Sequence, residues 1–243
     1  MTAPPPSRGN YRTVRQRPSS GNSPHPWPLR RPLRPQTPAD AAPDLWQNRP
    51  TPAPRSPVPD IPNLPGMGNP PDTPTQLAVV VGRVLQYALR ATDGLTVEQL
   101  CDTRGGITNS IGWDVWHVVR TIDNIIHFVF EREQPVWLQH AFHERWNLPR
   151  VDQGTGQDPR DAYAMRFPPP AEFDEYTRAV EAAVVPRIAA MSEAYLREVQ
   201  VIRPWGPVPR IEAILHGLIG HGNGHLGRAS YARTLFGLPG LPY

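Results

Sequence analysis

The chain has 243 residues, which is room for one ordinary domain and an appendage. It contains no lysine, so all 25 positive charges are arginines, and Schiff-base chemistry and a Walker-type phosphate lysine are excluded. The net charge is +3, but residues 75–243 hold 16 arginines against 18 acidic residues, a balance of −2, so we expect no nucleic-acid partner.

The first part of the chain is dominated by proline. Residues 1–74 contain 21 of the 33 prolines, and their nine arginines against four aspartates give a charge of +5. Such a composition buries too little apolar area to offset the entropy lost on ordering, so we predict a disordered Pro/Arg-rich tail over residues 1–73. The folded domain is predicted over residues 74–240. An alternative is that translation begins at Met67, which would make residues 1–66 an artefact of gene prediction.

The cysteine content and the hydropathy pattern bear on the compartment. Cys101 is the only cysteine, so no internal disulfide can form, and a reducing, cytoplasmic location is expected. No run of apolar residues approaches the length of about 18 that spans a bilayer, so no membrane partner is expected.

Four amphipathic segments follow the tail. They predict helices at about residues 73–91, 109–131, 171–191 and 209–236. The first begins at Thr73-Pro-Thr-Gln76, which has the pattern of a capping box with proline at the first helical position. Pro186 is expected to kink the third helix. No stretch is typical of a strand, so the predicted fold class is all-α, a four-helix bundle of antiparallel type.

A long connection separates the second and third predicted helices. Residues 137–170 exceed the usual length of a loop in a compact domain, and they contain Gly154-Thr-Gly156. The aromatic side chains of Phe142 and Trp146 favour a packed cover over a site rather than a disordered linker.

The fourth helix carries two histidines, His221 and His225, four positions apart. Side chains at this spacing lie about 40° apart around a helix axis, so both imidazoles can face one metal ion. His117, on the apolar face of the second helix, would supply a third nitrogen and leave positions open for water or substrate, which is the catalytic pattern. His216 lies about 140° around from His221 and is excluded. The alternatives are a glycine-rich surface segment with incidental histidines and, for His117, an ordinary core residue.

Glycines interrupt the same helix at four positions: Gly220, Gly222, Gly224 and Gly227. Each costs about 1 kcal/mol relative to alanine in a helix interior. We expect the close approach of neighbouring helices around a site to offset this cost.

Other polar side chains near the three histidines are candidates for further roles. Asp114 and Asn124, on the same side of the second helix as its histidine, are candidates for orienting a ligand imidazole, or else for capping and solvent-facing positions. Arg228 is the candidate for binding an anionic group of a cofactor, with a solvated arginine as the alternative. Tyr231 is a candidate proton donor. Three further histidines are expected in solvent: His127, His140 and His143.

Taken together, these motifs resemble the DinB-like superfamily, with its DinB/YfiT metalloenzyme-like fold. The resemblance rests on Asn109-Ser-Ile-Gly-Trp-Asp-Val-Trp-His117 and on His221-x3-His225-Leu-Gly-Arg-Ala. The ending Arg233-Thr-Leu-Phe-Gly-Leu-Pro-Gly240 and the Gly154-Thr-Gly156 loop also fit, so the resemblance covers about residues 74–240. The glycines beside the last two histidines depart from the family, in which helix-forming residues are commoner.

The resemblance implies a four-helix bundle in which His117, His221 and His225 hold a divalent metal ion. Zinc and nickel are the metals we expect. It also implies frequent homodimers. Characterised relatives include thiol S-transferases and isomerases that use low-molecular-weight thiols such as mycothiol or bacillithiol.

The predicted function is therefore that of a metal-dependent S-transferase, in which the metal activates a mycothiol-type thiol for reaction with a small-molecule substrate. Three neutral ligands leave the charge of the site near +2, which acidifies a bound thiol or water. A second hypothesis is metal-dependent hydrolysis by a metal-bound hydroxide, although no glutamate occupies the His-Glu-x-x-His position. A third is a non-catalytic stress or binding protein that docks through its proline-rich tail.

Overall fold

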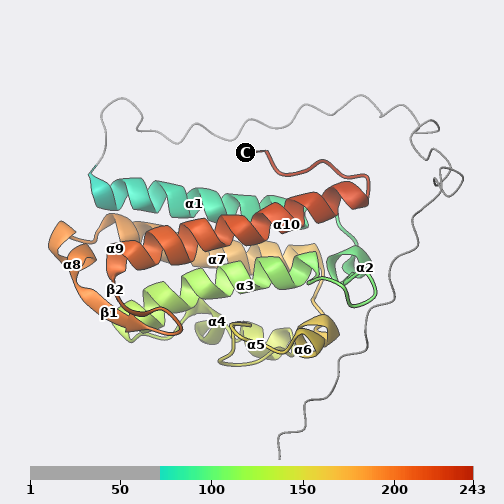
Figure 1. Ribbon diagram of the computed structural model, residues 1–243, viewed down its shortest axis with the longest axis horizontal. Coiled ribbons are helices and arrows are strands. Elements are labelled where there is room, and N and C mark those ends of the chain that lie inside the picture. The colour runs from blue at the N-terminus through green and yellow to red at the C-terminus, as the bar shows by residue number, and fades with distance from the viewer. Residues whose placement is uncertain (1–71, 243) are drawn as a thin grey trace, which may run out of the picture. The chain divides into compact units, whose positions relative to one another are not determined.

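The computed structural model describes residues 72–242 (Figure 1). The tail predicted for residues 1–73 lies outside the described residues, apart from its last two positions. The elements, with η for a π-helical segment, are α1 (Thr73–Thr92), α2 (Val97–Leu100), α3 (Ile111–Asp123), η2 (Asn124–Phe130), α4 (Val136–Gln139), α5 (Phe142–Arg145), α6 (Pro159–Ala164), α7 (Pro170–Ala189), α8 (Glu193–Arg197), β1 (Val199–Ile202), β2 (Gly206–Pro209), α9 (Arg210–Glu212), η3 (Ala213–Gly220) and α10 (His221–Leu235). The described residues form a helical bundle, which confirms the predicted all-α class. None of these helices combines the length and the apolar character needed to cross a membrane.

Four long helical stretches run alongside one another in Figure 1: α1, α3 continued by η2, α7, and η3 continued by α10. α1 packs mainly on α7, and α10 packs mainly on α3. The apolar stripes predicted from the sequence face inward, and their side chains are fully buried, as at Val81, Leu85, Ile122, Val180 and Val184. Burial of each such side chain contributes roughly 1.5–3 kcal/mol, so this core holds the two histidine-bearing helices in fixed register.

The ends of the helices are set by short polar side chains. The carboxylate of Asp72 accepts a hydrogen bond from the Thr75 amide at 3.0 Å, so the cap of α1 lies one residue before the predicted Thr73. Ser110 caps α3, as its position in the sequence indicates, and accepts from the Trp113 amide at 3.2 Å. α7 continues through Pro186 to Ala189. Proline lacks an N–H group, so one backbone hydrogen bond of the helix is lost there.

A β-hairpin precedes the last helix, and the expectation of no strand is wrong at this point. β1 pairs antiparallel with β2, with Ile202 opposite Gly206. Two prolines in the second strand hid it in the sequence, because proline is depleted in strands. The tip of the hairpin packs on η3, where the Trp205 ring lies directly over Gly217.

The glycines of the last helix do not share one explanation. A Cβ atom on Gly222 would lie 3.2 Å from a methyl group of Val84 in α1, so this glycine does permit a close helix approach. Among residues 72–242, no such neighbour lies within 4 Å of the corresponding positions on Gly224 and Gly227. Close helix packing therefore accounts for Gly222, as expected, but it does not offset the cost of Gly224 or Gly227.

Gly217→Ala and Gly224→Ala are expected to change stability in opposite directions. A Cβ at position 217 would lie 2.3 Å from the Trp205 ring, so overpacking should lower the free energy of unfolding by about 1–3 kcal/mol. Alanine at position 224 meets no atom and should raise it by about 0.4–1 kcal/mol. Urea unfolding of the two variants measures the difference, and equal stabilities would contradict the seating of the hairpin on η3.

The connection between η2 and α7 folds into α4, α5 and α6 and is packed, as its aromatic residues predict (Figure 1). The side chains of Trp137, Phe142 and Trp146 are buried. The Phe142 ring lies 4.9 Å from the ring of Tyr176 in α7, and the Trp146 ring lies 4.8 Å from that of Phe173. Residues 151–157 of the connection then contact the α3 side chains of Trp113, His117 and Arg120.

A buried carboxylate ties this connection to the bundle. Asp123, at the end of α3, accepts hydrogen bonds from the amides of Val136 and Trp137 and from the Tyr176 hydroxyl, each at 2.9 Å. His127 also contacts it, with Nδ1 2.9 Å from the carboxylate, and is only 1% exposed. The expectation that His127 lies in solvent is therefore wrong, because the chain after η2 turns back over it and Glu133 bonds to its carbonyl at 3.0 Å. His140 is exposed and His143 is partly buried.

Candidate metal centre

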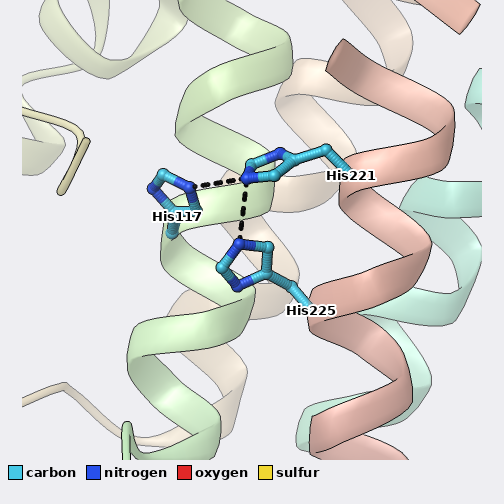
Figure 2. Close-up of side chains that lie close together, drawn as sticks. All are labelled: His117, His221 and His225. Carbon is cyan, nitrogen blue, oxygen red and sulfur yellow. Dashed lines mark hydrogen bonds between the residues drawn. The ribbon is translucent and has the colours of Figure 1, made fainter. Parts of the chain in front are cut away.

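Three histidines from α3 and α10 point at one another (Figure 2). The Nε2 atom of His221 lies 3.3 Å from Nε2 of His117 and 3.0 Å from Nε2 of His225. One ring nitrogen from each of the three lies within 4.8 Å of the others. Two nitrogens bound to zinc at a tetrahedral angle are about 3.3 Å apart, given bonds of about 2.0–2.1 Å. The spacing of the rings therefore fits a single ion.

The second ring nitrogens of two histidines are already occupied. Nδ1 of His225 lies 2.7 Å from the carboxylate of Asp114, which is itself buried on α3. Nδ1 of His117 contacts the main-chain carbonyl of Gln153. Both acceptors fix the proton on Nδ1 and leave the Nε2 lone pair free, as is usual for histidines that bind metals. Of the two candidates for orienting a ligand ring, Asp114 contacts a histidine, and it does so across helices.

Burial keeps the imidazoles of His117 and His221 neutral. His117 is 4% exposed, and its burial lowers the pKa of its ring to about 4. Burial also lowers the pKa of His221, with a further contribution from the neighbouring His225. Neutral imidazole is the form that binds metal ions, so these two rings are in the binding form at pH 7.

A tryptophan and a glycine hold the His117 ring in place. The Trp113 ring stacks on it, with centroids 4.8 Å apart and planes 16° apart. Gly154 passes close to both rings with φ +87°, and a Cβ there would lie 2.7 Å from Trp113 and 3.3 Å from His117 Nδ1. From the sequence, this glycine is predicted only to belong to a connection that covers the site. In the structure, the close approach of its backbone brings the Gln153 carbonyl to His117.

The sequence matches one family model along most of the folded domain. The model is described as the DinB superfamily, and it matches residues 81–229, which include all three histidines. The chain belongs to the DinB superfamily. No curated protein matches the sequence. A crystal structure of a conserved protein from Enterococcus faecalis is similar in fold, with a TM-score of 0.57 and 22% identity over 68% of this chain and 98% of that one.

In this DinB-superfamily protein the three histidines open into a pocket of about 820 Å³. Its walls come from α3 and η2, from residues 150–156 of the connection, and from residues 201–205 of the hairpin. A pocket of this volume accommodates a molecule of drug or metabolite size. The three-histidine cluster therefore faces a space in which a small molecule could bind.

The remaining candidate residues from the sequence differ in whether they line this pocket. Arg228 is half exposed and lies outside the pocket lining, donates to Asp114 at 2.8 Å, and contacts Nδ1 of His225. Asn124 lines the pocket but, within residues 72–242, makes no hydrogen bond to the three histidines. Tyr231 is 67% exposed on α10 and lies outside the lining. The roles predicted for Arg228 and Tyr231 stay predictions.

Proposed function

We propose that this protein is a metal-dependent transferase that acts on a low-molecular-weight thiol. His117, His221 and His225 would bind one divalent ion, with zinc and nickel as the expected metals. The main support is that three Nε2 atoms converge at 3.0 and 3.3 Å, while two of the rings have Nδ1 held by Asp114 and Gln153. A divalent ion held by three neutral ligands supplies a strong Lewis acid that lowers the pKa of a bound thiol.

The residues of the chain would bind and orient the reactants rather than react themselves. Within residues 72–242 the pocket lining contains no cysteine, so a thiol must arrive with a bound molecule. Asp114 would hold His225 in its binding orientation, and Trp113 would shield the His117 ring from water on one face. The open side of the cluster faces the pocket, where the thiol and its electrophilic partner would lie together.

Hydrolysis, the alternative predicted from the sequence, needs a base beside the site. Among the described residues Asp152 is the only carboxylate in the pocket lining, and one of its oxygens accepts the Gly154 amide at 2.8 Å. This contact ties Asp152 to the loop, and among the described residues no hydrogen bond joins it to the three histidines, which favours transfer over hydrolysis.

Turnover assays distinguish these possibilities. The protein is purified, loaded with zinc or nickel, and assayed with mycothiol and an aromatic chloride, and separately with a nitrophenyl ester. We expect metal-dependent thiol conjugation that exceeds ester hydrolysis and is absent after chelation. Conjugation that persists at full rate in the chelated protein would contradict the proposal, and the absence of any turnover would favour the non-catalytic alternative.

Asp114→Asn is expected to weaken metal binding by about 10–100-fold, because it removes the charge that orients His225. Asp161→Asn, at an exposed position on α6, is the matched control and should leave affinity unchanged. Competition with a chromophoric chelator measures both affinities. Equal affinities in the two variants would show that the Asp114 contact does not act on the metal site.

We also propose a compartment and an oligomeric state for the protein. A cytoplasmic location rests on Cys101 being the only cysteine. A homodimer rests on the resemblance to the family alone. Sedimentation of the purified protein tests the second, with a mass near twice 27.1 kDa expected.

A further inference from the structure

The charges that line the pocket are strongly unbalanced. Four arginines contribute to the lining: Arg120, Arg132, Arg150 and Arg203. Asp152 is the only acidic residue in the lining among the described residues, and Asp123, just outside the lining, offsets the charge of Arg120, so three arginines remain against one aspartate. A cleft lined by one sign of charge concentrates ligands of the opposite sign, which here means anions.

Arg120 is the innermost of these arginines. It lies on α3 one turn after His117, and its side chain is 1% exposed. Side chains three positions apart are neighbours on a helix surface, with Cβ atoms about 5–6 Å apart. The guanidinium is held 5.1 Å from the centre of the Trp137 ring and 3.7 Å from the Asp123 carboxylate. Its position beside the three-histidine cluster is therefore fixed by the core.

The hydrogen-bonding capacity of this buried guanidinium is largely unused. Nε and Nη1 of Arg120 are buried and have no hydrogen-bond partner among the described residues. Nη2 donates only to the Val151 carbonyl, at 3.4 Å. Buried donors in proteins are nearly always hydrogen-bonded, so spare donors on a charged group at a pocket wall indicate an acceptor that binds there.

The outer arginines are not neutralised by the protein. Arg150 and Arg203 are exposed, and neither has a carboxylate partner within residues 72–242. They line the pocket from two separate segments, one in the connection and one in the hairpin. The planar fork of arginine matches the oxygen pairs of carboxylate and phosphate groups.

We propose that these arginines form a subsite for a carboxylate or phosphate group of the substrate. Arg120 is its inner contact, and Arg150 and Arg203 bind the same group or a second anionic group from outside. A ligand held there would present the rest of its structure to the three-histidine cluster one helical turn away. The inference names a substrate class for the proposed transferase and rests on that function for the reaction, whereas anion binding itself needs no metal.

Calorimetric titration of the metal-free protein with succinate and with inorganic phosphate tests the subsite. Dimethyl succinate, which carries no charge, is the control ligand. We expect succinate, phosphate or both to bind and dimethyl succinate not to bind. Binding of succinate identifies a carboxylate site, and binding of phosphate alone identifies a phosphate site. If neither anion binds at low ionic strength, the proposal is overturned.

Variants assign the binding to the arginines. Arg120→Gln and Arg203→Gln should each weaken anion binding by at least about tenfold, the scale expected for a lost charged hydrogen bond. Arg197→Gln, on exposed α8 outside the lining, should leave it unchanged. If Arg120→Gln does not fold, the double variant at the exposed positions 150 and 203 carries the test. Unchanged binding in folded variants would overturn the assignment.

A histidine variant keeps this inference separate from the proposed function. His221→Ala should lose metal and retain anion binding, because the arginines do not depend on that ring. If the wild-type protein binds anions but takes up no metal, the metal proposal alone is contradicted. Metal uptake without anion binding would contradict the subsite alone.

Discussion

His221→Ala is expected to remove the metal ion and the proposed turnover together. Its Nε2 lies between those of His117 and His225, at 3.3 and 3.0 Å, so the variant retains only two of the three ligand nitrogens. The loss of a residue that only orients a ligand histidine costs up to about 100-fold in metal affinity, and the loss of the histidine itself should cost more. Elemental analysis after dialysis should find one ion per chain in the wild type and almost none in the variant.

The matched control is His216→Ala. His216 lies in η3, five positions earlier on the same helical stretch, and its side chain is exposed and lies outside the pocket lining. This variant should bind metal and turn over substrate as the wild type does. His221 is only partly buried, so its replacement should leave the fold intact by circular dichroism. Full metal occupancy in His221→Ala would show that the ligand set is wrong.

Asp123→Ala is expected to destabilise the protein by about 3–5 kcal/mol, the usual cost of leaving a buried charge without its partner. The change removes the acceptor of the Val136 and Trp137 amides and leaves the buried Arg120 guanidinium uncompensated. It also removes the acceptor of Tyr176, whose pKa burial raises well above its usual value, so that this hydroxyl remains a neutral donor. Such a loss is a large part of the stability of an ordinary domain.

Urea unfolding of Asp123→Ala and of Glu193→Ala gives the comparison. Glu193 forms a surface ion pair with Arg197 at 3.6 Å, with both side chains largely exposed. Exposed pairs of this kind contribute about 0–1 kcal/mol, so the control should unfold close to the wild type. If Asp123→Ala were as stable as Glu193→Ala, the carboxylate would not be what ties the connection to the bundle.

The sequence predicts those parts of the site that depend on helical periodicity. His117, His221 and His225 lie on inward faces because apolar residues repeat around them at helical spacing, and the core then sets the distance between α3 and α10. Asp114 could be proposed as an orienting residue from its position beside His117. That it contacts His225 instead depends on how the two helices pack, which periodicity does not specify.

The parts that the sequence does not predict depend on contacts between distant segments. The Gln153 carbonyl reaches His117 only because Gly154 adopts a positive φ beside the Trp113 ring. A backbone acceptor leaves no signature in residue type, and the glycine alone indicates only a turn. The hairpin was hidden by its prolines, and Arg120 is recognisable as a pocket residue only once its unpaired nitrogens and its neighbours are known.

X-ray absorption at the metal edge of the loaded protein tests most directly whether the three histidines bind one ion. The spectrum should show three imidazole nitrogens at about 2.0–2.1 Å from zinc, together with one or two further ligands from solvent or substrate. The same spectrum should be unchanged in His216→Ala. A protein that takes up no metal, or one whose bound metal shows no imidazole scattering, would contradict the account.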